Sequence, residues 1–211
     1  VNNTQPLPRG LLAELLPQVS ECPSAKLASK QLPSKICDLL ARSSDSPFEG
    51  LIRRSSLTGG PRRRAVVSDT AVMLMVEESL NHPSGCLFAH QNIAAQSSDL
   101  DAILATLTHY WRAVRDVFPD AWGLPPVKSR LMHGAGIRAM GRLMDKVMRA
   151  PSVPMQQVTR SLKHVAPFCK WTAGRWPEIN LEWNQLQNTP GHVNWLGDYL
   201  VRKYLAREGS K

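Results

Sequence analysis

Hydrophobic residues recur at spacings of three and four along most of this chain, which is the period of an amphipathic α-helix. The clearest stretch has its apolar positions at Leu100, Ile103, Leu104, Leu107, Trp111, Val114 and Phe118. Ser98 and Asp99 precede this stretch and can cap its first turn, and Pro119 follows it. The pattern therefore predicts a helix from about residue 100 to residue 118 that buries one side in a core.

The same period predicts further helices. We expect them over residues 9–16, about 24–40, 68–80, about 137–149, 155–166 and 190–205. Pro33 should either kink the second of these or begin a new helix, and Thr189 should cap the last one. No segment shows a convincing strand pattern. The chain is therefore predicted to be mainly α, a single helical region over residues 1–211.

The most informative segment begins at Leu131. His133 is followed by Gly134, Ala135 and Gly136, so the backbone can turn tightly and approach a partner closely. The N–H groups at the start of a helix are unpaired and suit an anion such as phosphate. His133, Gly134 and Gly136 are therefore candidate anion-binding residues, with a closely packed helix entrance as the alternative. On another face of the same helix, two residues are candidate nucleic-acid contacts, namely Arg138 and Arg142.

Residues 43–65 predict a flexible basic loop, because Ser, Pro and Gly dominate them. Two arginine clusters flank its Gly-containing tip and no acidic residue lies between them. These candidate phosphate contacts are Arg53, Arg54, Arg62, Arg63 and Arg64. Guanidinium groups gathered in this way favour contact with phosphate, although a solvated loop without a partner is the alternative.

Charge points in the same direction. The chain has 26 basic and 17 acidic residues, a formal charge of +9, and a hydrophobic content of 43% that is enough for a sizeable core. Chains this basic often meet nucleic acid or an acidic surface. No apolar run approaches the roughly 20 residues that span a bilayer, so no membrane partner is expected. The four cysteines form neither a CxxC pair nor a zinc pattern, which predicts no metal site and a cytoplasmic protein with reduced thiols.

Catalytic residues cannot be named from this sequence. It contains no Walker loop, GxGxxG, HExxH or GxSxG motif. Glu77 and Glu78 are neighbours on a helix and point about 100° apart, so we interpret them as a solvated face. Four tryptophans near the C-terminus suit either base stacking or core packing, and we favour packing: Trp171, Trp176, Trp183 and Trp195.

Three segments, in the expected order, resemble the DGQHR-domain family, bacterial proteins with a ParB/sulfiredoxin-like core. Residues 1–17 are similar to the family's IN-x-T-x-P-L-P … ELLP segment. His133–Ile137 with Met140 and Leu143–Asp145 resembles its HG-x-G … MD helix. The last segment resembles its W-x-x-G-x-W … WN-x-x-QNT … YL ending, carried here by Trp171, Gly174, Trp176, Trp183, Asn184, Gln187, Asn188, Thr189, Tyr199 and Leu200.

The Asp-Gly-Gln-His-Arg motif that names the family is missing from these residues, and in the family it lies upstream of the first segment. We therefore expect the helical C-terminal part of a longer ParB/sulfiredoxin-like α/β protein. One branch of the family, DndB-like, binds DNA and regulates phosphorothioation. The other, DpdB-like, works with a transglycosylase that places 7-deazaguanine in DNA, and is associated with ATP.

The resemblance implies a component of a bacterial DNA-modification and defence system that binds the DNA backbone. Two other functions remain open. The full-length protein could be an ATP-hydrolysing subunit that assists the base-modifying transglycosylase, with the His133 turn in its pocket. The chain could also be an interaction scaffold for a DNA-modifying enzyme.

Overall fold

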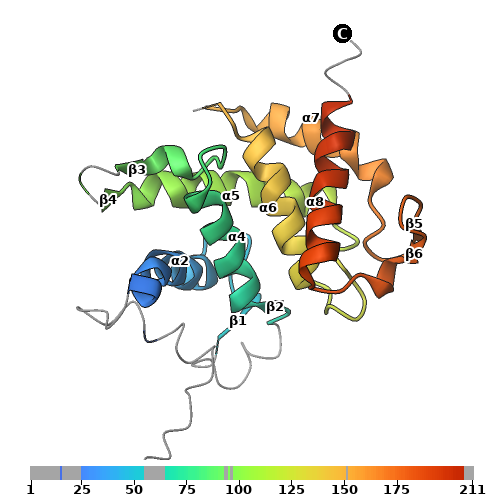
Figure 1. The fold of residues 1–211 in the computed structure, drawn as a ribbon, viewed down its shortest axis with the longest axis horizontal. Helices are drawn as coiled ribbons and strands as arrows, with labels where there is room; N and C mark the ends of the chain where they lie inside the picture. Colours follow the sequence, from blue (N-terminus) through green and yellow to red (C-terminus); the bar gives the residue numbers. More distant parts are fainter. Residues whose placement is uncertain are drawn as a thin grey trace, which may run out of the picture.

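The structure is a computed structural model that describes residue 15 and residues 25–54, 65–92, 95, 97–150 and 152–206 (Figure 1). Within these residues it has six α-helices: α2 (Ala25–Arg42), α4 (Asp69–Asn81), α5 (Leu100–Val117), α6 (Gly134–Val147), α7 (Met155–Val165) and α8 (Pro190–Leu205). The predicted mainly α fold is confirmed. Apart from Leu15, the helix expected over residues 9–16 lies outside the described residues.

Short elements connect these helices. Three are 3₁₀ turns: η2 (Phe88–His90), η3 (Ala166–Phe168) and η4 (Trp183–Gln185). Three pairs of strands also occur: β1 (Ile52–Arg53) parallel to β2 (Val67–Ser68), β3 (Gln91–Asn92) antiparallel to β4 (Ser97–Ser98), and β5 (Arg175–Trp176) antiparallel to β6 (Leu181–Glu182). The sequence did not predict these strands, because two residues are too few to show the alternation of a strand.

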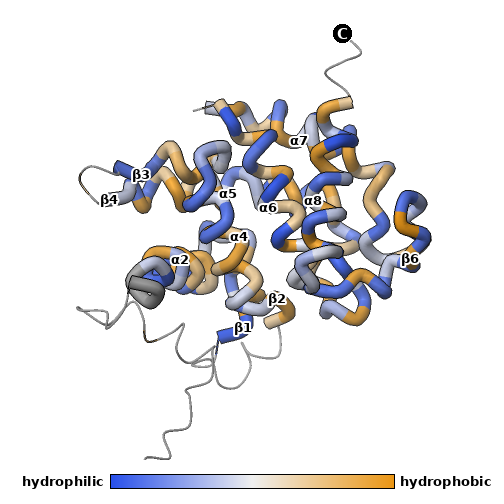
Figure 2. The backbone as a smooth tube through the Cα atoms, viewed as in Figure 1, coloured by the Kyte–Doolittle hydropathy of each residue, from blue (hydrophilic) through white to orange (hydrophobic). Residues whose placement is uncertain are grey.

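Helix α6 lies between α4 and α8 and contacts both of them (Figure 1). Helix α2 packs against α4, and α7 packs against α5 and α8. Hydrophobic and hydrophilic positions alternate along the helices (Figure 2), as expected where each helix buries one side. Both flanks of α6 are covered, which explains why nine of its residues are buried.

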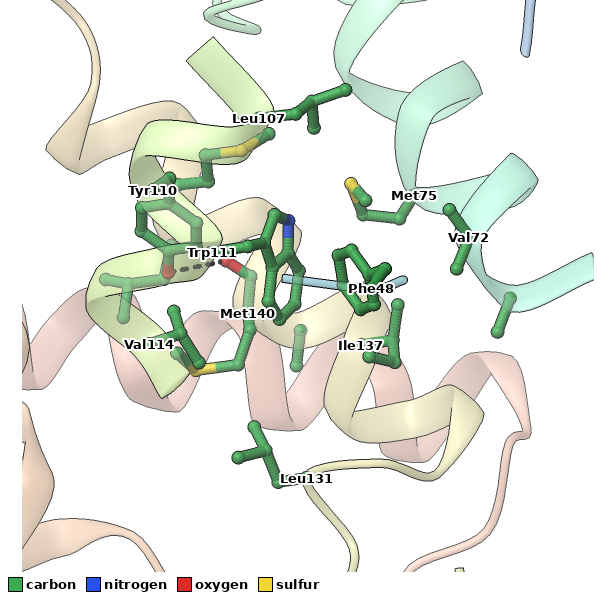
Figure 3. Close-up of a cluster of buried hydrophobic side chains, with 14 of the residues drawn as sticks. Phe48, Val72, Met75, Leu107, Tyr110, Trp111, Val114, Leu131, Ile137 and Met140 are labelled. Carbon is green, nitrogen blue, oxygen red and sulfur yellow. Dashed lines mark hydrogen bonds between the residues drawn. The ribbon is translucent and has the colours of Figure 1, made fainter. Parts of the chain in front are cut away.

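Aromatic side chains fill the centre of the core (Figure 3). Trp111 is fully buried, and its ring centroid lies 5.0 Å from that of Phe48 and 6.0 Å from that of Trp122. The buried Tyr110 donates its hydroxyl hydrogen to the carbonyl oxygen of Met140 at 2.9 Å. This bond ties α5 to α6 and satisfies a polar group that would otherwise be costly to bury.

The ends of the helices test the capping predictions. The Asp99 side chain accepts a hydrogen bond from Ala102 N at 3.0 Å, and Thr189 accepts one from His192 N at 3.4 Å. Both predicted caps are therefore present. Pro33 lies inside α2, which continues through it. The apolar spacing of residues 190–205 predicts that Leu205 is buried with the rest of this helix; it is instead 46% exposed, because it lies in the final turn of α8.

Candidate functional site

Residues 43–51 form a series of hydrogen-bonded turns that leads into β1, at the start of the range 43–65 for which the sequence predicts a flexible basic loop. Ser46 N donates to Ser43 O at 3.0 Å, and Gly50 N donates to Ala41 O at 3.1 Å. Phe48 and Ile52 are both 0% exposed. Two apolar side chains anchored in the core hold these turns in place, a feature that the Ser- and Pro-rich composition concealed.

The pairing of β1 with β2 brings together the two ends of the basic segment, defined here as residues 53–64. Arg53 pairs with Ser68, next to the start of α4, and its side chain is exposed. Residues 55–64 lie outside the described residues, and with them Arg62, Arg63 and Arg64. In the sequence these three arginines directly precede Ala65, which lies two residues before β2.

Arg54 has a different environment from Arg53. Its side chain is 3% exposed, and its Nη2 donates to Asp38 Oδ1 on α2 at 3.0 Å. Its Nη1 lies 3.9 Å from the buried Cys37 Sγ. Because alternate strand residues point to opposite sides, one arginine of the pair faces solvent and the other faces the core. Arg54 therefore fixes the end of β1 to α2, and we do not assign it a phosphate contact.

The His133 imidazole occupies the start of α6. It is the N-cap residue, and its Nδ1 accepts a hydrogen bond from Ala135 N at 3.4 Å. Burial, reinforced by the nearby Arg130 cation, lowers the pKa of His133 below its usual 6.5. The ring is therefore neutral at pH 7 and can accept this bond. It satisfies one of the N–H groups that an anion would otherwise use.

The glycines of this turn are closely packed. A Cβ atom on Gly136 would lie 2.0 Å from the carbonyl oxygen of Arg130, and one on Gly134 would lie 2.6 Å from the Asn188 side-chain nitrogen. Gly136 therefore needs glycine for packing, because the atom it would meet is backbone, whereas the exposed Asn188 side chain beside Gly134 can move aside. These contacts match the alternative of a packed helix entrance, so we do not assign an anion to His133, Gly134 and Gly136.

The arginines of α6 form a charged cluster with α4 and α8. Glu78 accepts hydrogen bonds from Arg138 and, at 3.5 Å, from Arg142 Nε. Arg142 Nη2 also donates to Asn194 Oδ1 on α8 at 2.8 Å. The Arg138 and Arg142 side chains are 15% and 29% exposed. Both arginines are engaged within the protein, so we leave them out of the proposed DNA contact.

Glu78 therefore differs from the solvated residue that the sequence predicted. Its side chain is 29% exposed and lies between the two arginines. The spacing of Arg138 and Arg142, four residues apart on one face of α6, was visible in the sequence. The acidic partner lies on a different helix, and a periodicity analysis of one helix at a time cannot find such a partner.

Asp145 is a second half-buried acid that the sequence did not single out. Its Oδ1 accepts hydrogen bonds from Ser79 Oγ at 2.5 Å and from Cys86 N at 3.0 Å. Burial raises the pKa of this carboxyl group, and the hydrogen bonds from Ser79 and Cys86 partly oppose the rise. The carboxyl group joins α6 to α4 and to the turn that follows it, which makes its immediate role structural.

A cavity of about 480 Å³ lies between α4, α6 and α8. Its lining has both charges: Glu78, Asp145 and Asp198 are acidic, and Arg142 and Lys146 are basic. Such a mixture can hold a polar molecule, and two of the lining side chains contact each other: Ser84 Oγ lies 2.8 Å from His82 Nδ1. The other lining residues are Asn81, His82, Ser84, Gly197 and Val201.

The three cysteines that the structure describes do not form a reactive centre. Cys37 and Cys86 are free and buried, and Cys169 is free and half-buried. Burial raises the pKa of the Cys37 thiol to about 12 and raises the pKa of Cys86 and Cys169 as well, so all three are protonated at neutral pH. In the described part of the chain, no group of three or more His, Cys, Asp and Glu side chains could hold a metal ion.

The tryptophans divide by burial. Trp176 is 0% exposed and Trp171 is 4% exposed, and their ring centroids are 5.5 Å apart. Trp195 is half-buried and stacks on Tyr199 at 5.1 Å. Trp183 is also half-buried. The first two side chains belong to the core, as the packing interpretation proposes.

No helix among the described residues has both the length and the apolar character needed to cross a lipid bilayer. Comparisons with protein-family models, curated proteins and solved structures find no match for this chain.

Proposed function

We propose that this chain binds the phosphate backbone of DNA through its basic segment, as a component of a bacterial DNA-modification and defence system of the 7-deazaguanine or phosphorothioate type. The type of system comes from the resemblance to the DGQHR-domain family. The formal charge of +9 supports a polyanionic partner. Such a protein would act in the cytoplasm, beside a DNA-modifying enzyme.

The observation that carries the proposal is the contrast between Arg53 and most described arginines, although Arg130, Arg149 and Arg160 also form no ion pair with a described residue. Eight described arginines form an ion pair with a carboxylate: Arg42, Arg54, Arg112, Arg115, Arg138, Arg142, Arg175 and Arg202. Arg53 is exposed and has no ion pair with any described residue. The basic segment thus begins with a guanidinium group that an external anion can reach.

The anchoring of the segment suits phosphate better than bases. β1 holds the start of the segment against the core and β2 follows it in sequence, and four of its arginines remain candidates for phosphate contact: Arg53, Arg62, Arg63 and Arg64. Phosphate contacts position a protein on DNA and carry no sequence information, whereas sequence is read by groups placed against base edges. We therefore expect binding that depends strongly on salt and weakly on sequence.

The test compares two triple variants of equal charge. R62A/R63A/R64A removes three cations of the basic segment, and the control K35A/R115A/K128A removes three exposed cations elsewhere. Binding of a fluorescein-labelled duplex is followed by anisotropy at several salt concentrations. The basic-segment variant should flatten the plot of log affinity against log salt by about 0.9 for each lost contact.

The control should keep a slope close to that of the wild type. Equal slopes for the wild type and R62A/R63A/R64A would remove the basic segment from the interface. Wild-type protein that binds no duplex at low salt would overturn the proposed function as a whole. Arg53→Ala tests the exposed arginine singly and should flatten the slope by about 0.9 without changing the melting temperature.

A further inference from the structure

The net positive charge of this chain is concentrated in its C-terminal half. Residues 146–177 include six Lys and Arg residues and no Asp or Glu. Helix α7 lies in this stretch and buries Val158, Leu162 and Val165 against the core. Its outer side is therefore a surface of positive charge with no acidic neighbour in sequence.

We propose that the outer face of α7 is a second surface for the DNA phosphate backbone. This cationic face is defined by four exposed residues: Gln156, Gln157, Arg160 and Lys163. The inference rests on the proposed function and extends it to a second surface, because α7 lies at the upper edge of the view in Figure 1 and the β1–β2 pair lies at the lower edge.

The two cations of this face are available to an external anion. Arg160 and Lys163 form no ion pair with any described residue, unlike the eight paired arginines. They are three residues apart on one helix, so they lie on the same side with Cβ atoms about 5–6 Å apart. Neighbouring cations at this spacing can contact successive phosphates of one strand.

The first turn of α7 adds uncharged donors to the same face. Pro154 is its N-cap and provides no side-chain hydrogen bond, and the turn contains no acidic residue. Gln157 N and Val158 N donate to Pro154 O at 2.9 and 3.1 Å, which leaves the N–H groups of Met155 and Gln156 for an anion, and the side-chain amides of Gln156 and Gln157 can donate as well. Phosphate oxygens accept hydrogen bonds from helix N-termini, glutamine amides, arginine and lysine alike, so each of these groups can contact the DNA backbone.

The test uses two double variants of equal charge. R160Q/K163Q removes the cations of the α7 face, and glutamine keeps a high helix propensity. The control K35Q/K128Q removes two exposed lysines, one on α2 and one in the turn before Arg130. Circular dichroism checks that both variants are folded, and anisotropy with a fluorescein-labelled duplex of mixed sequence gives the salt dependence.

The α7 variant should flatten the slope of log affinity against log salt by about 1.8, which corresponds to two lost phosphate contacts. The control should retain the wild-type slope. The proposal for the α7 face is overturned if the slope changes equally in both variants, or in neither. This holds even if the R62A/R63A/R64A variant shows the flattened slope expected for the basic segment. If R160Q/K163Q loses binding to poly-glutamate but binds DNA as the wild type does, the α7 face binds an acidic protein, and the inference is overturned. Failure of the wild type to bind duplex overturns both proposals.

Discussion

Replacement of Trp176 by alanine tests whether the C-terminal tryptophans serve packing or base stacking. The side chain is 0% exposed. Its ring centroid lies 5.5 Å from that of Trp171 and 5.8 Å from those of Trp195 and Tyr199, each edge to face. The indole therefore joins the β5–β6 hairpin to α8, and its removal leaves a cavity that three rings cannot easily fill.

The magnitude follows from the buried area. A buried tryptophan removes about 150–250 Å² from water, which at about 25 cal/mol per Å² amounts to roughly 4–6 kcal/mol as an upper value. Measured truncations of buried aromatic residues cost about 3–5 kcal/mol. A domain of this size loses about 2–4 °C per kcal/mol, so the melting temperature should fall by roughly 6–20 °C.

The assay is urea and thermal unfolding followed by circular dichroism, so that loss of a fluorophore does not affect the signal. Trp183→Ala is the matched control, because this side chain is half-buried and has no ring contact among the described residues. It should cost about 1–2 kcal/mol, an ordinary value for a point substitution. A Trp176→Ala protein as stable as the wild type, but unable to bind single-stranded DNA, would refute the packing interpretation in favour of stacking.

Two further substitutions test the centre of the fold. Burial raises the pKa of Asp145, so the folded state holds its proton more tightly than the unfolded state, and the stability that this group contributes falls as pH rises above the usual 3.8. Urea unfolding across pH 3.5–7 should therefore show the wild type losing stability relative to Asp145→Asn as pH rises through this window; a constant difference would contradict the raised pKa. Gly136→Ala places a Cβ atom 2.0 Å from a carbonyl oxygen and should cost about 1–3 kcal/mol, whereas Gly191→Ala enters open space in the first turn of α8 and should be neutral or slightly stabilising. Equal melting temperatures for the two glycine variants would contradict the close packing of the α6 entrance.

Helix positions could be predicted because each depends on a local signal. Asp99 and Thr189 cap the helices that they were expected to cap, and the apolar spacing of residues 100–118 gives a helix with Leu107 and Trp111 in the core. Capping and amphipathic periodicity depend on residues that are close together in the sequence, so both can be predicted without the tertiary structure.

The candidate site was less predictable because its contacts join distant residues. Arg53 and Arg54 are adjacent in sequence, yet one is exposed and the other is paired with Asp38. Arg138 contacts Glu78 across 60 positions of the chain. A cluster of charge in the sequence gives no information about which members have acidic partners in the fold. The availability of each arginine to an anion therefore had to come from the tertiary structure.

The parallel contact of β1 with β2 has a consequence for the tolerance of this chain to insertions. Arg53 and Ser68 are paired, so the fold fixes the distance between β1 and β2 whatever the number of residues that connects them. Each doubling of a flexible connection costs only about 0.6 kcal/mol. An insertion between residues 54 and 65, such as a peptide tag or a spectroscopic probe, should therefore cost little stability as long as the β1–β2 pairing is kept.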